Sequence, residues 1–239
     1  MREDVPLVVA KVNDSAVVAH RGIIANPNCT TMALMMAAGP LHRSFGLERM
    51  VATSYQSTSG SGQKGIDVLL AEIDALRSDP EAMVDGGWVD PGNTVYTRPI
   101  GFNVLPLAGS MADAGYTDEE WKLVNETRKI LDAPGIRIEP TCVRVPTLVG
   151  HGIAASMWFG DAVDPAEARA VLASAPGAQL WDDEKVPTAL DSAGLDDVLI
   201  GRVRATIGDP GGINLWVVGD NLRKGAALNA VEIAELLLA

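Results

Sequence analysis

Two side chains of reactive type stand where a nucleophile and an acid/base partner could be placed. Cys29 lies in the stretch ANPNCTT, where an apolar run of strand length gives way to a helical pattern. A helix N-terminus offers unpaired N–H groups and a partial positive charge, which favour a thiolate and could stabilise an oxyanion. His151 lies between two glycines, and a base close to the cysteine would complete a Cys–His pair. A buried structural cysteine and an ordinary hydrogen-bonded histidine are the open alternatives.

Charged residues could supply the binding groups. Arg144 alternates with valines in CVRVP, so it would lie inside an apolar strand, where an unpaired charge is costly. Its planar fork suits a carboxylate, from the protein or from a ligand. Glu119, Lys122, Glu126 and Lys129 recur at three- and four-residue steps and share one helix face. That face is either solvated and held by weak ion pairs, or it binds a zwitterion, with an acid for an amine and a lysine for a phosphate.

Two further segments could approach an anionic ligand. Gln56 precedes the run STSGSG, and a glycine-serine loop after a strand lets a ligand come close to the backbone. The same composition is typical of flexible linkers. Asn221 opens the run NLRKG at the start of the last helical pattern, which is either an anion site or a helix cap with two exposed cations.

The elements that must position these residues are short strands with interspersed helices. Apolar runs predict strands at 5–9, 21–25, 51–55, 136–145, 153–159, 198–207 and 213–218. Helical signals begin at Asn28 (with Pro40 expected to kink or end that helix), at 66, at the Thr117 capping box, at 164 and at Asn221. Residues 86–102 are rich in Gly, Pro and Asn and predict a loop. This order favours an α+β fold with a mixed sheet over a pure βαβ winding.

Composition excludes several classes of protein. The 239 residues are 47% hydrophobic and carry a net charge of −12, which argues against a broad nucleic-acid surface. An anionic ligand would therefore need local cations. No apolar run reaches membrane-spanning length, so no membrane partner is expected. The two cysteines form no disulfide or zinc pattern, no metal site is expected, and a reduced cytoplasmic protein is the simplest interpretation.

Taken together, six segments resemble the aspartate-semialdehyde dehydrogenases. They are GIIANPNCTTM, SYQSTSGSG, FNVLPLAGS, EEWKLVNETRKIL, CVRVPTLVGHG and GDNLRKGAALN, and they occur in that order across nearly the whole chain. Each motif alone is weak, whereas the ordered set is specific. The resemblance implies the NADPH-dependent reduction of L-aspartyl 4-phosphate to aspartate semialdehyde with release of phosphate, in lysine, threonine and methionine biosynthesis. It also implies a homodimer or a dimer of dimers, formed through the sheet of the middle domain.

The resemblance also implies a catalytic pair and part of the substrate site. By position, Cys29 resembles the nucleophile that forms an acyl-enzyme thioester, and His151 resembles its acid/base partner. Gln56 is similar to the residue that orients the substrate or the intermediate. Arg144 matches the clamp on the substrate α-carboxylate.

The remaining matched positions imply contacts to the amine, the phosphate and the cofactor. Glu119 matches the contact to the α-amino group, and Lys122 matches a phosphate ligand. Ser59, Gly60 and Asn221 match contacts to NADP(H).

The resemblance has one large departure. No G-x-G-x-x-G turn follows an N-terminal strand here, and the nucleotide-binding half of the family lies ahead of where these residues start. We therefore expect strands of an incomplete Rossmann-type domain over 1–28, a catalytic and dimerisation domain over 29–218, and over 219–239 a helix that would pack on the nucleotide-binding domain. We also expect impaired NADPH binding by this chain alone. The alternatives are an N-acetyl-glutamyl-phosphate reductase-like enzyme and a non-catalytic dimerisation fragment.

Overall fold

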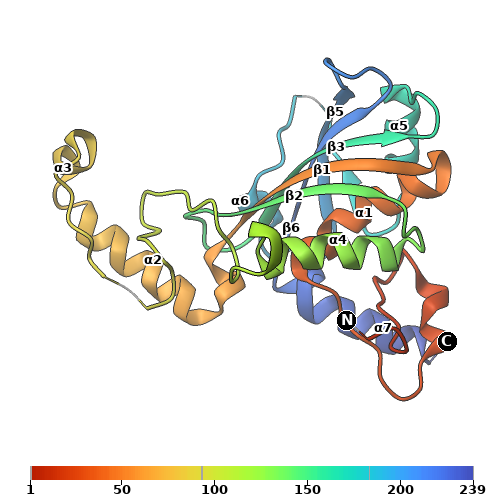
Figure 1. Ribbon diagram of the computed structural model, residues 1–239, viewed down its shortest axis with the longest axis horizontal. Helices are drawn as coiled ribbons and strands as arrows, with labels where there is room; N and C mark the ends of the chain where they lie inside the picture. The colour runs from red at the N-terminus through yellow and green to blue at the C-terminus, as the bar shows by residue number, and fades with distance from the viewer. Residues whose placement is uncertain (1, 93, 183, 239) are drawn as a thin grey trace.

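A six-stranded mixed sheet forms the centre of the molecule in a computed structural model, which describes residues 2–92, 94–182 and 184–238 (Figure 1). The strands are β1 (Leu47–Gln56), β2 (Arg137–Arg144), β3 (His151–Phe159), β4 (Ala178–Leu180), β5 (Val198–Ala205) and β6 (Ile213–Gly219). Their order is β2-β1-β3-β6-β5-β4, with parallel pairing at the β1–β2 and β4–β5 edges and antiparallel pairing between. The predicted α+β class with a mixed sheet is confirmed. The three-residue strand β4 gave no apolar run in the sequence and was missed.

The central helix α1 (Cys29–Phe45) packs against β1, β3, β5 and β6 and is buried along residues 30–41. Asn28 caps it as predicted, because its Oδ1 accepts the N–H groups of Thr30 at 3.0 Å and Thr31 at 3.3 Å. Of the two effects expected of Pro40, a kink or an end of the helix, the second is wrong. Pro40 costs the helix one hydrogen bond, but its ring is buried with the rest of this segment, and packing carries the helix on to Phe45.

Helix α4 (Asp118–Ile130) lies between β2 and α1. The predicted capping box is confirmed: Thr117 Oγ1 accepts the Glu120 N–H, and the Glu120 carboxylate accepts the Thr117 N–H at 2.7 Å. The other Glu120 oxygen accepts the Cys142 N–H of β2 at 2.9 Å. One buried carboxylate therefore fixes the start of α4 on the strand that carries Arg144.

The two N-terminal apolar runs do not form the predicted strands. They meet in one isolated parallel bridge between Leu7 and Ala25, on either side of the short helix η1 (Asp14–Ala19). Main-chain groups that a neighbouring strand would bind are held instead by Asn229, whose side chain donates to Val8 O at 2.9 Å and accepts from Ala10 N at 3.0 Å. A strand needs a ladder of partners along its length, and these segments have a partner at one position only.

Asn229 belongs to the last helix, α7 (Leu228–Leu236), which follows the π-helical turn η4 (Arg223–Ala227). The interpretation of NLRKG as a helix cap with two exposed cations is wrong for one of them, because Lys224 is only 1% exposed. Its ammonium group donates to Glu232 Oε2 at 2.6 Å and to the carbonyl oxygen of Ala10 at 3.0 Å. Figure 1 shows α7 beside the N-terminal segment, and these contacts hold the two together.

An arm projects from the body of the molecule (Figure 1). It consists of the turn η2 (Thr58–Ser61), the helices α2 (Gln63–Leu76) and α3 (Pro80–Asp85), and the described residues of the predicted loop, 86–92 and 94–102. Glu72 of α2 anchors the loop, because its carboxylate accepts the N–H groups of Ile100 and Gly101. The returning loop thereby forms one wall of the cavity described below.

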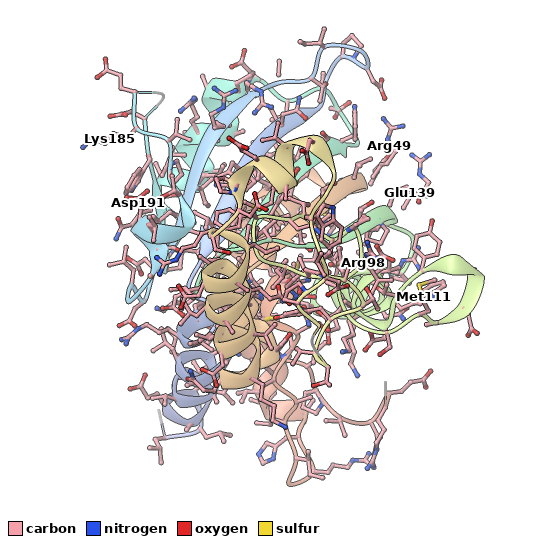
Figure 2. The ribbon with its side chains drawn as sticks, turned by 90° about the vertical axis from the view of Figure 1, so that its left-hand side faces the viewer. Arg49, Arg98, Met111, Glu139, Lys185 and Asp191 are labelled. Atoms are coloured by element: carbon pink, nitrogen blue, oxygen red, sulfur yellow. The ribbon has the colours of Figure 1, made fainter. Side chains whose placement is uncertain are left out.

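The sheet face opposite α1 carries polar and aromatic side chains. The Arg49 guanidinium lies 3.8 Å from the Trp158 ring centroid and pairs with Asp209, and Figure 2 shows Arg49 and Glu139 on the same side of the molecule. Helices α5 (Pro165–Ala173) and α6 (Ala189–Ser192) lie beside the β4–β5–β6 half of the sheet. Within the described ranges, no helix is both long and apolar enough to cross a bilayer.

Candidate active site

Five of the nine predicted site residues line one cavity of about 390 Å³, where α1 begins and β1 and β2 end. They are Cys29, Gln56, Gly60, Glu119 and Arg144. These positions are as much as 115 residues apart in sequence (144 − 29), so the parallel β1–β2 pair, which aligns Gln56 with Arg144, is what brings them together. The loop around Tyr96 and the segment before α4 close the other sides.

Cys29 is the first residue of α1 and is half-buried. Two N–H groups of the first turn, those of Thr30 and Thr31, are not free for an oxyanion, because Asn28 Oδ1 accepts both of them. Gly225 of η4 sits directly behind the cysteine, and a Cβ at that glycine would lie 3.1 Å from Cys29 Cβ. The π-helical turn therefore limits how far the thiol can retreat from the cavity.

The thiol of Cys29 is protonated at neutral pH in this site. Burial raises its pKa to about 11, with a further contribution from the negative charge of Glu119. Hydrogen bonds from Thr30 and the charge of Arg144 act in the opposite direction and do not prevail. The helix N-terminus alone thus does not produce a thiolate, and a proton acceptor or a bound cation is needed.

His151, the first residue of β3, is fully buried. Its Nδ1 accepts the main-chain N–H of Ser57 at 3.1 Å, whereas no described residue partners Nε2. A Cβ at Gly60 would lie 3.1 Å from Nε2, so this nitrogen faces the glycine that lines the cavity. Burial and then the charge of Arg144 lower the histidine pKa to about 3, although a backbone hydrogen bond at Gly150 opposes them. The ring is therefore neutral.

Arg144, at the end of β2, is 6% exposed and lines the cavity. Its Nη1 donates to the carbonyl oxygen of Ser57 at 2.7 Å, and its guanidinium carbon lies 6.0 Å from the Tyr96 ring centroid. Across the part of the chain that the structure describes, Arg144 makes no ion pair. A buried cation that still has unused donors at a cavity wall is suited to bind an anion.

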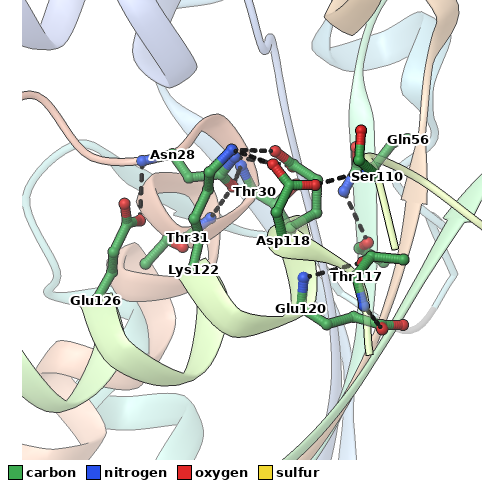
Figure 3. A network of polar contacts seen from close by, with 12 residues as sticks. Asn28, Thr30, Thr31, Gln56, Ser110, Thr117, Asp118, Glu120, Lys122 and Glu126 are labelled. Atoms are coloured by element: carbon green, nitrogen blue, oxygen red, sulfur yellow. Dashed lines mark hydrogen bonds and ion pairs between the residues drawn. The ribbon is translucent and has the colours of Figure 1, made fainter. Parts of the chain in front are cut away.

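Glu119 and Lys122 form the ion pair that the helix spacing predicted, at 2.9 Å, and Asp118 joins them at 3.1 Å (Figure 3). Burial disfavours the charge of Lys122, but the two carboxylates outweigh it and raise the lysine pKa. Glu119 also accepts from Asn28 Nδ2 at 2.8 Å. Lys122 itself lines a neighbouring, more apolar cavity of about 620 Å³, so the structure does not bring it into the cavity of Cys29.

Gln56 is held in one orientation. Its Nε2 donates to Ser54 Oγ of the same strand at 3.2 Å, and its side chain is almost fully buried at the cavity wall (Figure 3). The carboxamide oxygen is the group left to face a ligand.

Ser59 and Asn221 are also buried, and they bind each other. Asn221 Nδ2 donates to Ser59 Oγ at 2.9 Å, and Asn221 Oδ1 accepts the Gly150 N–H at 2.9 Å. Both residues therefore belong to a buried hydrogen-bond network with Ser57 and Gly150, whereas Gly60 is exposed and lines the cavity.

Sequence reasoning missed two residues that hold the site together. Asn28 was assigned only a capping role, yet it links α1 to Glu119, and its own N–H donates to the carboxylate of Glu126 at 2.9 Å (Figure 3). Burial raises the pKa of Glu126. The helix-face pattern in the sequence does not distinguish this glutamate from its more exposed neighbours. Ser57 was treated as part of a loop, although it contacts both His151 and Arg144. Only the proximity of separate segments reveals these roles.

Comparisons with known proteins agree with this arrangement. Residues 39–224 match the semialdehyde dehydrogenase dimerisation domain. The chain is 49% identical to an aspartate-semialdehyde dehydrogenase of Streptomyces akiyoshiensis, over 99% of this chain and 70% of that protein. It is 46% identical to that of Corynebacterium melassecola, with the same coverage.

A solved structure, aspartate semialdehyde dehydrogenase II from Vibrio cholerae, superposes with a TM-score of 0.90 at 42% identity, covering 98% of this chain and 68% of that one. The extent and level of these matches go well beyond a shared fold. The chain belongs to the aspartate-semialdehyde dehydrogenase family of oxidoreductases.

Proposed function

We propose that the chain carries the catalytic site for the reductive dephosphorylation of L-aspartyl 4-phosphate to L-aspartate 4-semialdehyde. The observation that carries this proposal is the cavity in which a cysteine, a buried arginine and an acid converge. The family membership supports the reaction class. A structure of the 42% identical Vibrio cholerae protein is described as complexed with ASA, which supports a small amino-acid aldehyde as ligand.

In the proposed mechanism, Cys29 attacks the acyl phosphate carbon, forms a thioester and releases phosphate. Because the thiol pKa is about 11, its proton must pass to an acceptor, and the candidate is neutral His151 in the tautomer that carries its proton on Nδ1, since no described residue partners the Nε2 atom that faces Gly60. The same nitrogen could later protonate a departing or carbonyl oxygen.

Charged residues would orient the substrate. Arg144 binds the α-carboxylate, because it is a buried cation with unused donors. Among the described residues, its one side-chain hydrogen bond runs from Nη1 to the carbonyl oxygen of Ser57. Glu119 binds the α-ammonium group, and an ammonium there would also offset the charge that raises the Cys29 pKa. Lys122 binds the phosphate only after it leaves its pair with Glu119, because it lines the adjacent cavity in this state.

The proposed cofactor is NADP(H), which would supply the hydride that reduces the thioester. The residues present fit a nicotinamide ring in one respect: a Cβ at Gly60 would lie 2.8 Å from Arg144 Nη1 and 3.1 Å from His151 Nε2, so the glycine keeps open a space beside these two side chains. Ser59 and Asn221 would reach the cofactor only by releasing each other. With no glycine-rich dinucleotide turn in these 239 residues, we propose weak binding by the chain alone, which fluorescence titration with NADPH would measure.

We also propose the domain division expected from the sequence, with 29–218 as the catalytic and dimerisation domain and with 1–28 and 219–239 belonging to a nucleotide-binding unit. The contacts of Asn229 and Lys224 with the N-terminal segment support grouping the last two. We also propose a homodimer that forms through the sheet face opposite α1, and sedimentation equilibrium would test it.

A comparison of acyl phosphates tests the function. Thiol acylation of Cys29 is measured by mass spectrometry with L-aspartyl 4-phosphate and with N-acetyl-glutamyl phosphate. A mass shift on Cys29 with the first substrate only is expected, because Glu119 favours a free amine. Preference for the acetylated substrate would support the alternative reductase, and no acylation by either would support a non-catalytic dimerisation fragment.

A further inference from the structure

Ser57 has no role in the proposed function, yet it makes two contacts with one atom of His151. The residue is fully buried. Its main-chain N–H lies 3.1 Å from His151 Nδ1, and its hydroxyl oxygen lies 3.0 Å from the same nitrogen. A main-chain N–H can only donate, whereas a hydroxyl can donate one hydrogen and also accept. Ser57 thus places a fixed donor and a possible acceptor beside one ring nitrogen, which uses the donor when it carries a lone pair and the acceptor when it carries a proton.

The hydrogen of this hydroxyl has two alternative acceptors. Besides His151 Nδ1, the oxygen lies 3.1 Å from Asn221 Oδ1, which can only accept. When the hydroxyl points to Asn221, its lone pair faces the ring and can accept an Nδ1–H, and the Ser57 N–H then gives up its hydrogen bond to Nδ1. In the other state the main-chain N–H of Ser57 donates to Nδ1, with or without the hydroxyl turned toward the ring, and the ring proton is on Nε2. Ser59 is compatible with both states, because its oxygen accepts from Asn221 Nδ2 and can donate to Ser57.

The two states give Nε2, the ring nitrogen that faces Gly60, opposite properties. No described residue partners His151 Nε2, so its chemistry depends on where the ring proton lies. With the proton on Nε2, this atom donates to an oxygen of the ligand. With the proton on Nδ1, it is a lone pair that can accept the Cys29 thiol proton.

We infer that Ser57 is a positioning residue that allows His151 to exchange between its two neutral tautomers. The inference rests on the proposed function in taking His151 as the proton partner of Cys29. In the forward step the thiol proton moves to Nε2 of the Nδ1–H tautomer, which yields a thiolate and an imidazolium. The imidazolium then gives its Nε2 proton to a ligand oxygen and returns to the neutral Nδ1–H ring, so the step requires the tautomer that the Ser57 hydroxyl makes accessible.

The test is the tautomer ratio of His151 in the 239-residue chain with ¹⁵N-labelled histidine. Long-range ¹H–¹⁵N correlation distinguishes the two forms, and the His151 signals are assigned by their loss in His151→Gln. Ser57→Ala removes the hydroxyl and keeps the N–H, so the ratio of Nδ1–H to Nε2–H should fall about tenfold or more. Ser54→Ala is the matched control: it removes an equally buried hydroxyl that contacts Gln56 instead, and the ratio should stay unchanged.

Each outcome bears on the inference. Ser57→Thr, which keeps the hydroxyl, should retain the ratio of the unsubstituted chain. An unsubstituted chain wholly in the Nε2–H form overturns the inference without any variant, as does a folded Ser57→Ala chain with an unchanged ratio. The proposed function is tested separately by the rate at which iodoacetamide alkylates Cys29. An equal rate in His151→Gln would refute the Cys–His pairing and leave the tautomer result standing.

Discussion

Replacing Gly60 by alanine tests whether the space beside Arg144 and His151 is a ligand site. The new Cβ would lie 2.8 Å from Arg144 Nη1 and 3.1 Å from His151 Nε2, both well inside normal contact distance. Gly60 does not have a left-handed backbone, so alanine introduces no conformational strain. The clash must therefore be relieved by moving one of the two side chains.

The size of the effect follows from what holds those side chains. His151 is fully buried and cannot shift easily, so the arginine has to move. Its Nη1 would then lose the 2.7 Å hydrogen bond to Ser57 O. A hydrogen bond that involves a charged group contributes about 1.5–3 kcal/mol. If the displaced guanidinium loses a comparable amount of binding energy toward a carboxylate, the dissociation constant should rise about 10- to 150-fold.

The assay is calorimetric titration of the chain with aspartate semialdehyde, with Gly135→Ala as the matched control. A Cβ at Gly135 meets no atom within 4 Å, so its affinity should equal that of the unsubstituted chain. Gly135→Ala should melt with the unsubstituted chain, whereas loss of the Arg144 hydrogen bond should lower the melting temperature of Gly60→Ala by about 3–12 °C. A single cooperative transition in both variants separates this local effect from loss of the fold. Unchanged affinity in Gly60→Ala would refute the assignment of this space to the ligand.

Three further predictions concern ionisation. The Cys29 pKa of about 11 predicts that its alkylation rate rises about tenfold per pH unit from about pH 7 to pH 10, whereas a plateau near pH 8.5 would contradict burial of the thiol. Glu119→Gln removes a charge that raises this pKa and should speed alkylation roughly threefold at pH 8, while Asp118→Asn, which alters the Lys122 pair and the hydrogen bond from the Ser110 N–H, should not. The His151 pKa of about 3 means that the unfolded chain alone takes up a proton below about pH 6.5, so stability should fall with decreasing pH by up to about 1.4 kcal/mol per unit. Urea denaturation should show a shallower loss between pH 7 and pH 4 in His151→Gln, and an equal loss would count against a buried neutral ring.

Signals carried by neighbouring residues were sufficient for much of the fold. The caps at Asn28 and Thr117 formed where their side chains predicted, because a cap bonds to main-chain groups two or three residues away. The predictions of a helix end at Pro40 and of strands in the N-terminal apolar runs were wrong because their outcome depends on residues far away in the sequence. A proline inside a helix is tolerated when surrounding elements bury it, and an apolar segment becomes a strand only beside a partner, neither of which is encoded locally.

For the site, the sequence by itself determined which residue types are present and, through six ordered motifs, the family they belong to. Only the tertiary structure decided that Cys29 is protonated, that Lys122 faces a different cavity, and that Ser57 holds His151. Motifs preserve identity and spacing along the chain. Charge state and hydrogen bonding depend instead on burial and on partners up to 164 positions away, as between Ser57 and Asn221, and these exist only after the chain has folded.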